Sequence, residues 1–93
     1  MTEAEIDGAL EDLPGWRRTG GEIVGTRRTP DFATAFALGT RIALLAERRD
    51  HHPRLTIAWG RVTAALTSHD AGAITARDLD MAREISAWTE WKD

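Results

Sequence analysis

Hydrophobic positions along the chain change their spacing several times, and each change marks a new predicted element. Apolar residues recur at helical spacing in the segments 2–13, 30–49 and 75–88. They alternate with polar residues, as in half-buried strands, in the segments 54–59 and 61–67 and in the first half of 22–28. A further strand is predicted near 16–19, as the first arm of a weakly coded hairpin with 22–28.

Turn and cap residues separate these segments. Thr2 and Glu5 match a capping box at a helix N-terminus, and Gly20-Gly21 supplies a permissive backbone for a hairpin. Thr29 is expected to cap the long helix, with Pro30 at its first helical position. The resulting order, αββαββα, predicts an α+β fold: a single four-stranded antiparallel sheet with helices packed on one face. We expect one domain over 1–93.

Two finer expectations concern packing. The long helix is expected to bury one face, whose members share helical spacing: Phe32, Ala35, Phe36, Gly39, Ala43 and Ala46, widened by Leu38, Ile42 and Leu45. In the strand 22–28 the apolar alternation fades halfway, which favours an edge position for that strand.

Composition narrows the possible functions. The chain has no cysteine, which excludes disulfides and thiolate metal sites. A formal net charge of -3 argues against direct nucleic-acid binding. No apolar stretch approaches the roughly 20 residues that span a bilayer, and the acidic N-terminus lacks a secretory pattern. We therefore expect a cytoplasmic protein with no membrane partner.

The three histidines are predicted to lie together. His51 and His52 precede one strand and His69 follows the next, and a tight hairpin through Gly60 would bring those strand ends side by side. Acidic and basic residues surround the same end of the sheet: Glu47, Asp50, Asp70, Arg77 and Asp78. Imidazole transfers protons near neutral pH and carboxylates orient it, so acid–base chemistry suits this set.

Three other interpretations compete with acid–base catalysis. The histidine spacing matches no short zinc-ligand motif, so no metal is expected. Consecutive side chains such as Ser68-His69-Asp70 do not generally face one another as a catalytic triad requires. The histidines could also have a purely structural role, in helix capping and a polar loop.

Motifs along nearly the whole chain agree in one register with a known family. They are Gly15-Trp16, Asp31-Phe32 with Phe36, Ala46-Glu47, His51-His52-Pro53, Arg61-Val62, Ser68-His69-Asp70-Ala71-Gly72 and Thr75-Ala76-Arg77-Asp78. In these motifs the chain resembles the pterin-4a-carbinolamine dehydratase family.

The resemblance implies an enzyme that removes water from 4a-hydroxytetrahydropterin to give quinonoid dihydropterin, thereby recycling pterin cofactor. It implies catalytic histidines, with His51 and His69 transferring protons and His52 orienting the substrate. Residues implied in substrate binding or tuning are Glu47, Asp50, Pro53, Ser68, Asp70, Arg77, Asp78 and Trp16. It implies no cofactor and no metal, and a homodimer or homotetramer.

Two alternatives to this dehydratase remain. Proteins resembling this fold also act as noncatalytic dimerisation or assembly modules, which retention of all three histidines disfavours. The same fold could act on a different pterin, because one sequence does not reveal the shape of a pocket.

Overall fold

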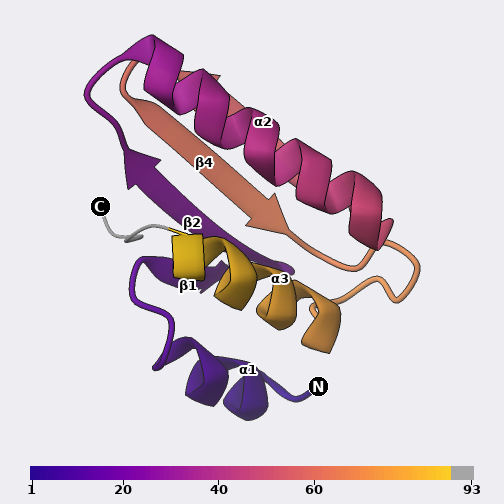
Figure 1. Ribbon diagram of the computed structural model, residues 1–93. Helices are drawn as coiled ribbons and strands as arrows, with labels where there is room; N and C mark the ends of the chain where they lie inside the picture. Colours follow the sequence, from indigo (N-terminus) through magenta and orange to yellow (C-terminus); the bar gives the residue numbers. More distant parts are fainter. Residues whose placement is uncertain (89–93) are drawn as a thin grey trace.

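The computed structural model describes residues 1–88; the predicted domain also includes 89–93, which lie outside the described residues. Three helices and four strands follow the predicted order (Figure 1). The helices are α1 (Glu3–Leu10), α2 (Phe32–Arg49) and α3 (Ala76–Trp88). The strands are β1 (Trp16–Thr19), β2 (Glu22–Arg28), β3 (Arg54–Ala58) and β4 (Arg61–Leu66). The predicted α+β fold is confirmed.

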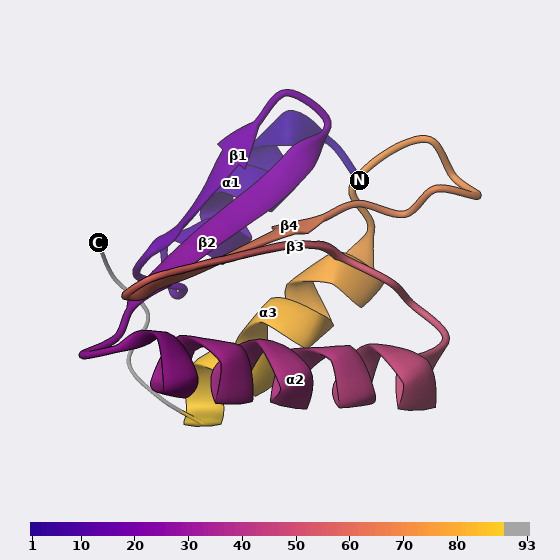
Figure 2. The same ribbon diagram turned by 90° about the horizontal axis from the view of Figure 1, so that it is seen from above.

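One antiparallel sheet with the strand order β1-β2-β4-β3 forms the centre of the molecule. Helices α2 and α3 lie on the same face of this sheet (Figure 2). Helix α1 packs against β1, where Asp7 of α1 binds Arg18 with an Oδ1 to Nε distance of 2.9 Å. No described helix is long and apolar enough to cross a membrane.

Strand β2 is central, so the expected edge position was wrong. Ile23 pairs with Leu66, and both side chains are fully buried beneath the helices. The alternation fades because two positions on the helix-facing side of β2 lack an apolar side chain: Gly25, which accommodates the Trp16 ring, and Arg27, which pairs with Val62. An added Cβ at Gly25 would lie 2.6 Å from that ring. The Trp16 side chain therefore fills the space that an apolar side chain at position 25 would otherwise occupy.

The buried face of α2 is rotated from the expected one. Ala35, Gly39, Ile42, Leu45 and Ala46 are buried, as predicted. Phe32, Phe36 and Ala43 were predicted to be buried but are exposed. An added Cβ at Gly39 would collide with the Ile57 side chain of β3, so the side of α2 that carries Gly39 lies directly against the sheet.

The start of α2 also differs from expectation. Asp31, rather than Thr29, is the N-cap, and its side chain accepts a 2.7 Å hydrogen bond from Thr34 N–H. Pro30 therefore precedes the cap. The predicted capping box of α1 is confirmed, since Thr2 and Glu5 each accept a hydrogen bond from the other's backbone N–H.

Candidate functional site

Two loops meet at one end of the sheet and carry all the histidines. One loop, 50–53, joins α2 to β3, and the other, 67–75, joins β4 to α3 (Figures 1 and 2). They lie together because β3 and β4 pair antiparallel, with Arg54 opposite Ala65, so that the start of β3 lies beside the end of β4.

An open cavity of about 280 Å³ lies between these loops. Its lining is strongly polar: Asp50, His51, His52, His69, Asp70 and Arg77. The structure thus brings together all three predicted histidines and three of the predicted charged residues. Within residues 1–88, no three His, Asp or Glu side chains are placed to hold a metal ion.

The backbone at the end of α2 sets the position of His51. Asp50 has φ 48° and ψ 45°, a left-handed conformation that Asp tolerates better than most residues. The following His51 N–H donates a 3.1 Å hydrogen bond to the Ala46 carbonyl, which closes a Schellman-type helix end. This turn directs the chain from α2 under the sheet edge and buries His51, which is 8% exposed.

Asp78 holds the ring of His51. Its Oδ1 lies 2.5 Å from His51 Nε2, and Asp78 is fully buried. Asp78 comes from the first turn of α3, where its Oδ2 accepts a 2.9 Å hydrogen bond from Thr75 N–H as a helix cap. The same oxygen accepts a 2.9 Å hydrogen bond from Ser68 Oγ, also fully buried. Asp78 therefore caps a helix with one oxygen and contacts a histidine with the other.

The hydroxyl groups around Asp78 form a chain with one direction. Ser68 has one hydroxyl proton, which it donates to Asp78, so it must accept in its 2.6 Å contact with Thr75 Oγ1. Thr75 donates that bond, and its own oxygen accepts from Arg77 N–H at 3.3 Å. Each group is satisfied when Asp78 is a carboxylate that only accepts hydrogen bonds.

His52 and His69 are both exposed and differ in their partners. His52 Nε2 lies 2.5 Å from Glu47 Oε2, five residues earlier at the end of α2. The His69 side chain has no hydrogen-bond partner among residues 1–88. It stands on a tight turn closed by the pairing of Ser68 with Ala73, in which Gly72 takes φ 65°.

Arg77 and Asp70 form an ion pair at the cavity wall, with a 2.6 Å distance from Arg77 Nη2 to Asp70 Oδ1. This hydrogen bond lowers the pKa of the Asp70 carboxyl below its ordinary value and raises the pKa of the Arg77 guanidinium. Asp70 is therefore a fixed negative charge at neutral pH, and it orients the guanidinium.

Other predicted site residues lie outside the cavity wall. Trp16 is 5% exposed in the core, where its Nε1 donates a 2.8 Å hydrogen bond to Ser86 Oγ. Ser68 and Asp78 are buried behind His51, and Glu47 contacts His52. Pro53 is half-buried beside the histidines.

Sequence reasoning missed a second, smaller cavity of about 120 Å³. It shares His51 and Arg77 with the first, and its other lining residues are Arg49, Asp80 and Met81. The helical spacing of Arg77, Asp80 and Met81 was a usable signal, because residues three and four apart share one face of a helix.

The amino-acid sequence and the fold were both compared with those of known proteins. The family model of pterin 4 alpha carbinolamine dehydratase matches residues 1–88. A relative from Roseiflexus sp. (strain RS-1), provisionally named pterin-4-alpha-carbinolamine dehydratase, is 46% identical over 85 residues, covering 91% of each chain. One from Rhizorhabdus wittichii with the same provisional name is 45% identical over 92 residues, covering 97% of this chain and 95% of that one.

A solved structure extends the agreement to the backbone. The crystal structure of a Brucella melitensis protein described as a transcriptional coactivator/pterin dehydratase superposes with a TM-score of 0.87. The two chains are 37% identical, and the match covers 94% of this chain and 95% of that one. The chain therefore belongs to the pterin 4 alpha carbinolamine dehydratase family.

Proposed function

We propose that this protein dehydrates 4a-hydroxytetrahydrobiopterin, a pterin 4a-carbinolamine, to quinonoid dihydropterin and water. In this reaction a base removes a ring N–H proton, the C4a–O bond breaks, and an acid protonates the departing hydroxyl. The observation that carries the proposal is the cavity lined by His51, His52 and His69, with His51 fixed by a buried carboxylate.

His51 is the proposed base. The carboxylate of Asp78 accepts hydrogen bonds from Ser68 and Thr75, and it accepts a third from His51 Nε2–H. A neutral imidazole carries one N–H, so Nδ1 of His51 then bears a lone pair. Nδ1 has no hydrogen-bond partner among the described residues. His51 therefore takes the proton through Nδ1.

His69 is the proposed acid. Its exposed side chain is free to carry a proton into the cavity and to regain one from water. His52, held by Glu47, orients the substrate. The opposite environments of His51 and His69, one buried and fixed, the other exposed and unpartnered, support their division into base and acid.

The charged wall of the cavity supplies substrate binding. Arg77, oriented by Asp70, presents guanidinium N–H groups that suit the carbonyl oxygen and ring nitrogens of a pterin. Asp50 lies on the same wall and can accept hydrogen bonds from the exocyclic amine. Asp78 and Ser68 act through His51, so we assign them as positioning residues.

Pterin recycling is the role that we propose for this activity, and the cytoplasm is the proposed compartment. A homo-oligomer is proposed on a separate observation, the exposed apolar surface of α2. Phe32, Phe36 and Leu44 are 48%, 53% and 57% exposed, and such surface favours association with a second copy. Sedimentation of wild type beside Phe36→Glu tests this, since a monomeric wild type would contradict it.

The experiment that tests the proposed activity is the rate of 4a-hydroxytetrahydropterin dehydration with a metal chelator present. We expect chelator-resistant acceleration over buffer. Parallel assays with other pterins distinguish this substrate from a different pterin. If the folded protein accelerated the dehydration of none of these pterins, the result would instead favour a noncatalytic dimerisation or assembly module.

A further inference from the structure

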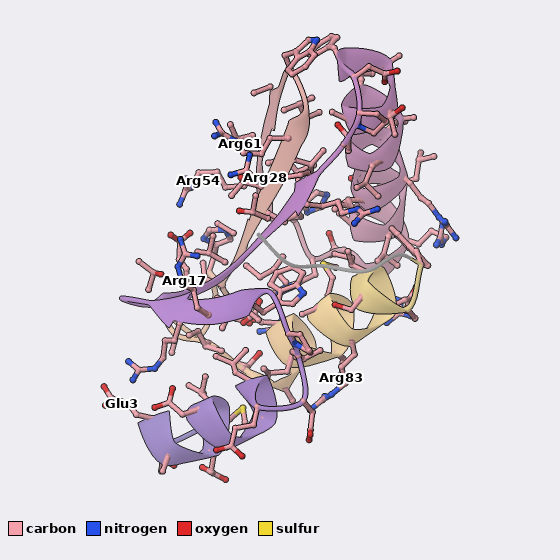
Figure 3. All side chains as sticks on the ribbon, turned by 90° about the vertical axis from the view of Figure 1, so that its left-hand side faces the viewer. Glu3, Arg17, Arg28, Arg54, Arg61 and Arg83 are labelled. Carbon is pink, nitrogen blue, oxygen red and sulfur yellow. The ribbon has the colours of Figure 1, made fainter. Side chains whose placement is uncertain are left out.

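The sheet face opposite the helices carries a cluster of arginine side chains. Residues paired in register project to the same face, and Trp16 and Gly25 mark the face toward the helices. The intervening positions project outward and include Arg17, Arg28, Arg54 and Arg61. Figure 3 shows these four on one side of the sheet, whereas Arg83 of α3 lies on the helix side. We name them the arginine face.

Arg28 and Arg61 stand directly opposite each other in the pairing of β2 with β4. Both are exposed, and neither makes a hydrogen bond or ion pair with any residue in 1–88. Like charges at directly opposed positions destabilise a sheet. Arg54 differs, since its Nη2 lies 2.7 Å from Glu22 Oε1. Repulsion between the guanidinium groups of Arg28 and Arg61 therefore destabilises the sheet locally, and an anionic partner would relieve it.

An exposed tryptophan lies next to this pair. Trp59 is 75% exposed, the highest value among the large hydrophobic side chains of residues 1–88. It is the first of the two turn residues, Trp59 and Gly60, between Ala58 and Arg61. Gly60 also accepts a 2.9 Å hydrogen bond from Thr29 N–H, which fixes the turn to the end of β2. Tryptophan and arginine are the residues most enriched at the centres of protein interfaces.

We infer that the arginine face docks an acidic segment of a partner protein. Carboxylates of that segment pair with Arg28 and Arg61, whose planar guanidinium groups suit bidentate binding, and an apolar side chain covers Trp59. The chain's net charge of -3 opposes a long polyanion such as nucleic acid. Beside these arginines the described strands and the turn at 59–60 offer one aromatic side chain, Trp59, whereas single-stranded nucleic acid is bound by several aromatic side chains that stack successive bases.

The test measures binding of a fluorescein-labelled peptide of repeated Glu-Glu-Leu by anisotropy at low ionic strength. We expect Arg28→Glu with Arg61→Glu to weaken binding by about tenfold or more, and Trp59→Ala to weaken it without changing its salt dependence. Arg83→Glu makes half of that charge change on the helix side, equal to that of either single replacement, and should bind as wild type. Circular dichroism shows that each variant is folded.

Three outcomes would overturn the inference. The wild type could fail to bind the peptide, or Arg83→Glu could weaken binding as much as the double variant, which would show only general electrostatic attraction. An oligodeoxythymidine probe could bind tighter than the peptide at matched ionic strength, which would assign the face to nucleic acid. The dehydration rate plays no part in these outcomes, so they are independent of the proposed activity.

Discussion

Asp78 Oδ1 lies 2.5 Å from His51 Nε2, although His51 comes from the loop 50–53 and the fully buried Asp78 comes from the first turn of α3. In the mechanism that we propose, this contact decides which ring nitrogen of His51 acts as the base. Because the other oxygen of Asp78 caps α3, the orientation of the histidine is tied to a rigid helix end.

Replacing Asp78 with Asn should reverse the tautomer of His51. The amide oxygen can still accept from Ser68 and Thr75, but its NH2 group would donate to His51 Nε2 and leave the proton on Nδ1. We expect kcat to fall by about 10²- to 10⁴-fold, the usual contribution of a general base, with a much smaller change in KM. Steady-state kinetics measures this split.

The control for Asp78→Asn is stability. The isosteric amide should unfold near the wild-type temperature, whereas Asp78→Ala leaves buried Ser68 without its acceptor and should lose about 1–3 kcal/mol. A fully active Asp78→Asn would contradict the tautomer argument.

Asp70 should not set the pH dependence of the reaction near neutrality. The hydrogen bond from Arg77 lowers the pKa of the Asp70 carboxyl, so the ion pair is complete above the ordinary aspartate range and is lost only as pH falls through the lowered value. In kcat/KM profiles over about pH 5–8, Asp70→Asn should raise KM and leave the inflections in place. An inflection that moves would assign Asp70 a proton-transfer role.

Gly25 should be required for packing of the Trp16 ring. An alanine Cβ there would lie 2.6–2.8 Å from ring atoms that the Ser86 hydrogen bond holds in place. We expect Gly25→Ala to lower the free energy of unfolding by about 1–3 kcal/mol in urea denaturation. Gly21→Ala is the matched control, since an added Cβ there meets nothing within 4 Å. Equal stability of the two variants would contradict the close contact.

Arg28→Glu should stabilise the sheet. The substitution converts the facing pair with Arg61 from like to opposite charges, which favours the folded state by about 0.2–1 kcal/mol. Thermal and urea unfolding at low salt measure the gain, and added salt should reduce it. Unchanged stability at low salt would show that the two guanidinium groups do not repel.

Local patterns in the sequence sufficed for the element order and for bringing the histidines together. The alternation around Gly60 predicts the β3–β4 hairpin, and a hairpin alone places His51 near His69. The Thr75 to Asp78 spacing likewise predicts a capped α3. These features depend on neighbours close in the chain, which is why periodicity and cap chemistry reveal them.

Features that depend on distant contacts could not be predicted in this way. The central place of β2 follows from its pairing with β4, and the exposure of Phe36 follows from which side of α2 packs against the sheet. The second role of Asp78, as partner of His51, requires the loop 50–53 and the start of α3 to be placed together in three dimensions. Cap spacing alone assigns that carboxylate to its own helix.

The most direct test of the central claim compares dehydration of 4a-hydroxytetrahydropterin by wild type, His51→Ala and His69→Ala, with chelator present. We expect wild type to accelerate the reaction and each variant to lose about 10²-fold or more of that acceleration while remaining folded. Variants that retain wild-type rates would contradict histidine acid–base catalysis in this cavity.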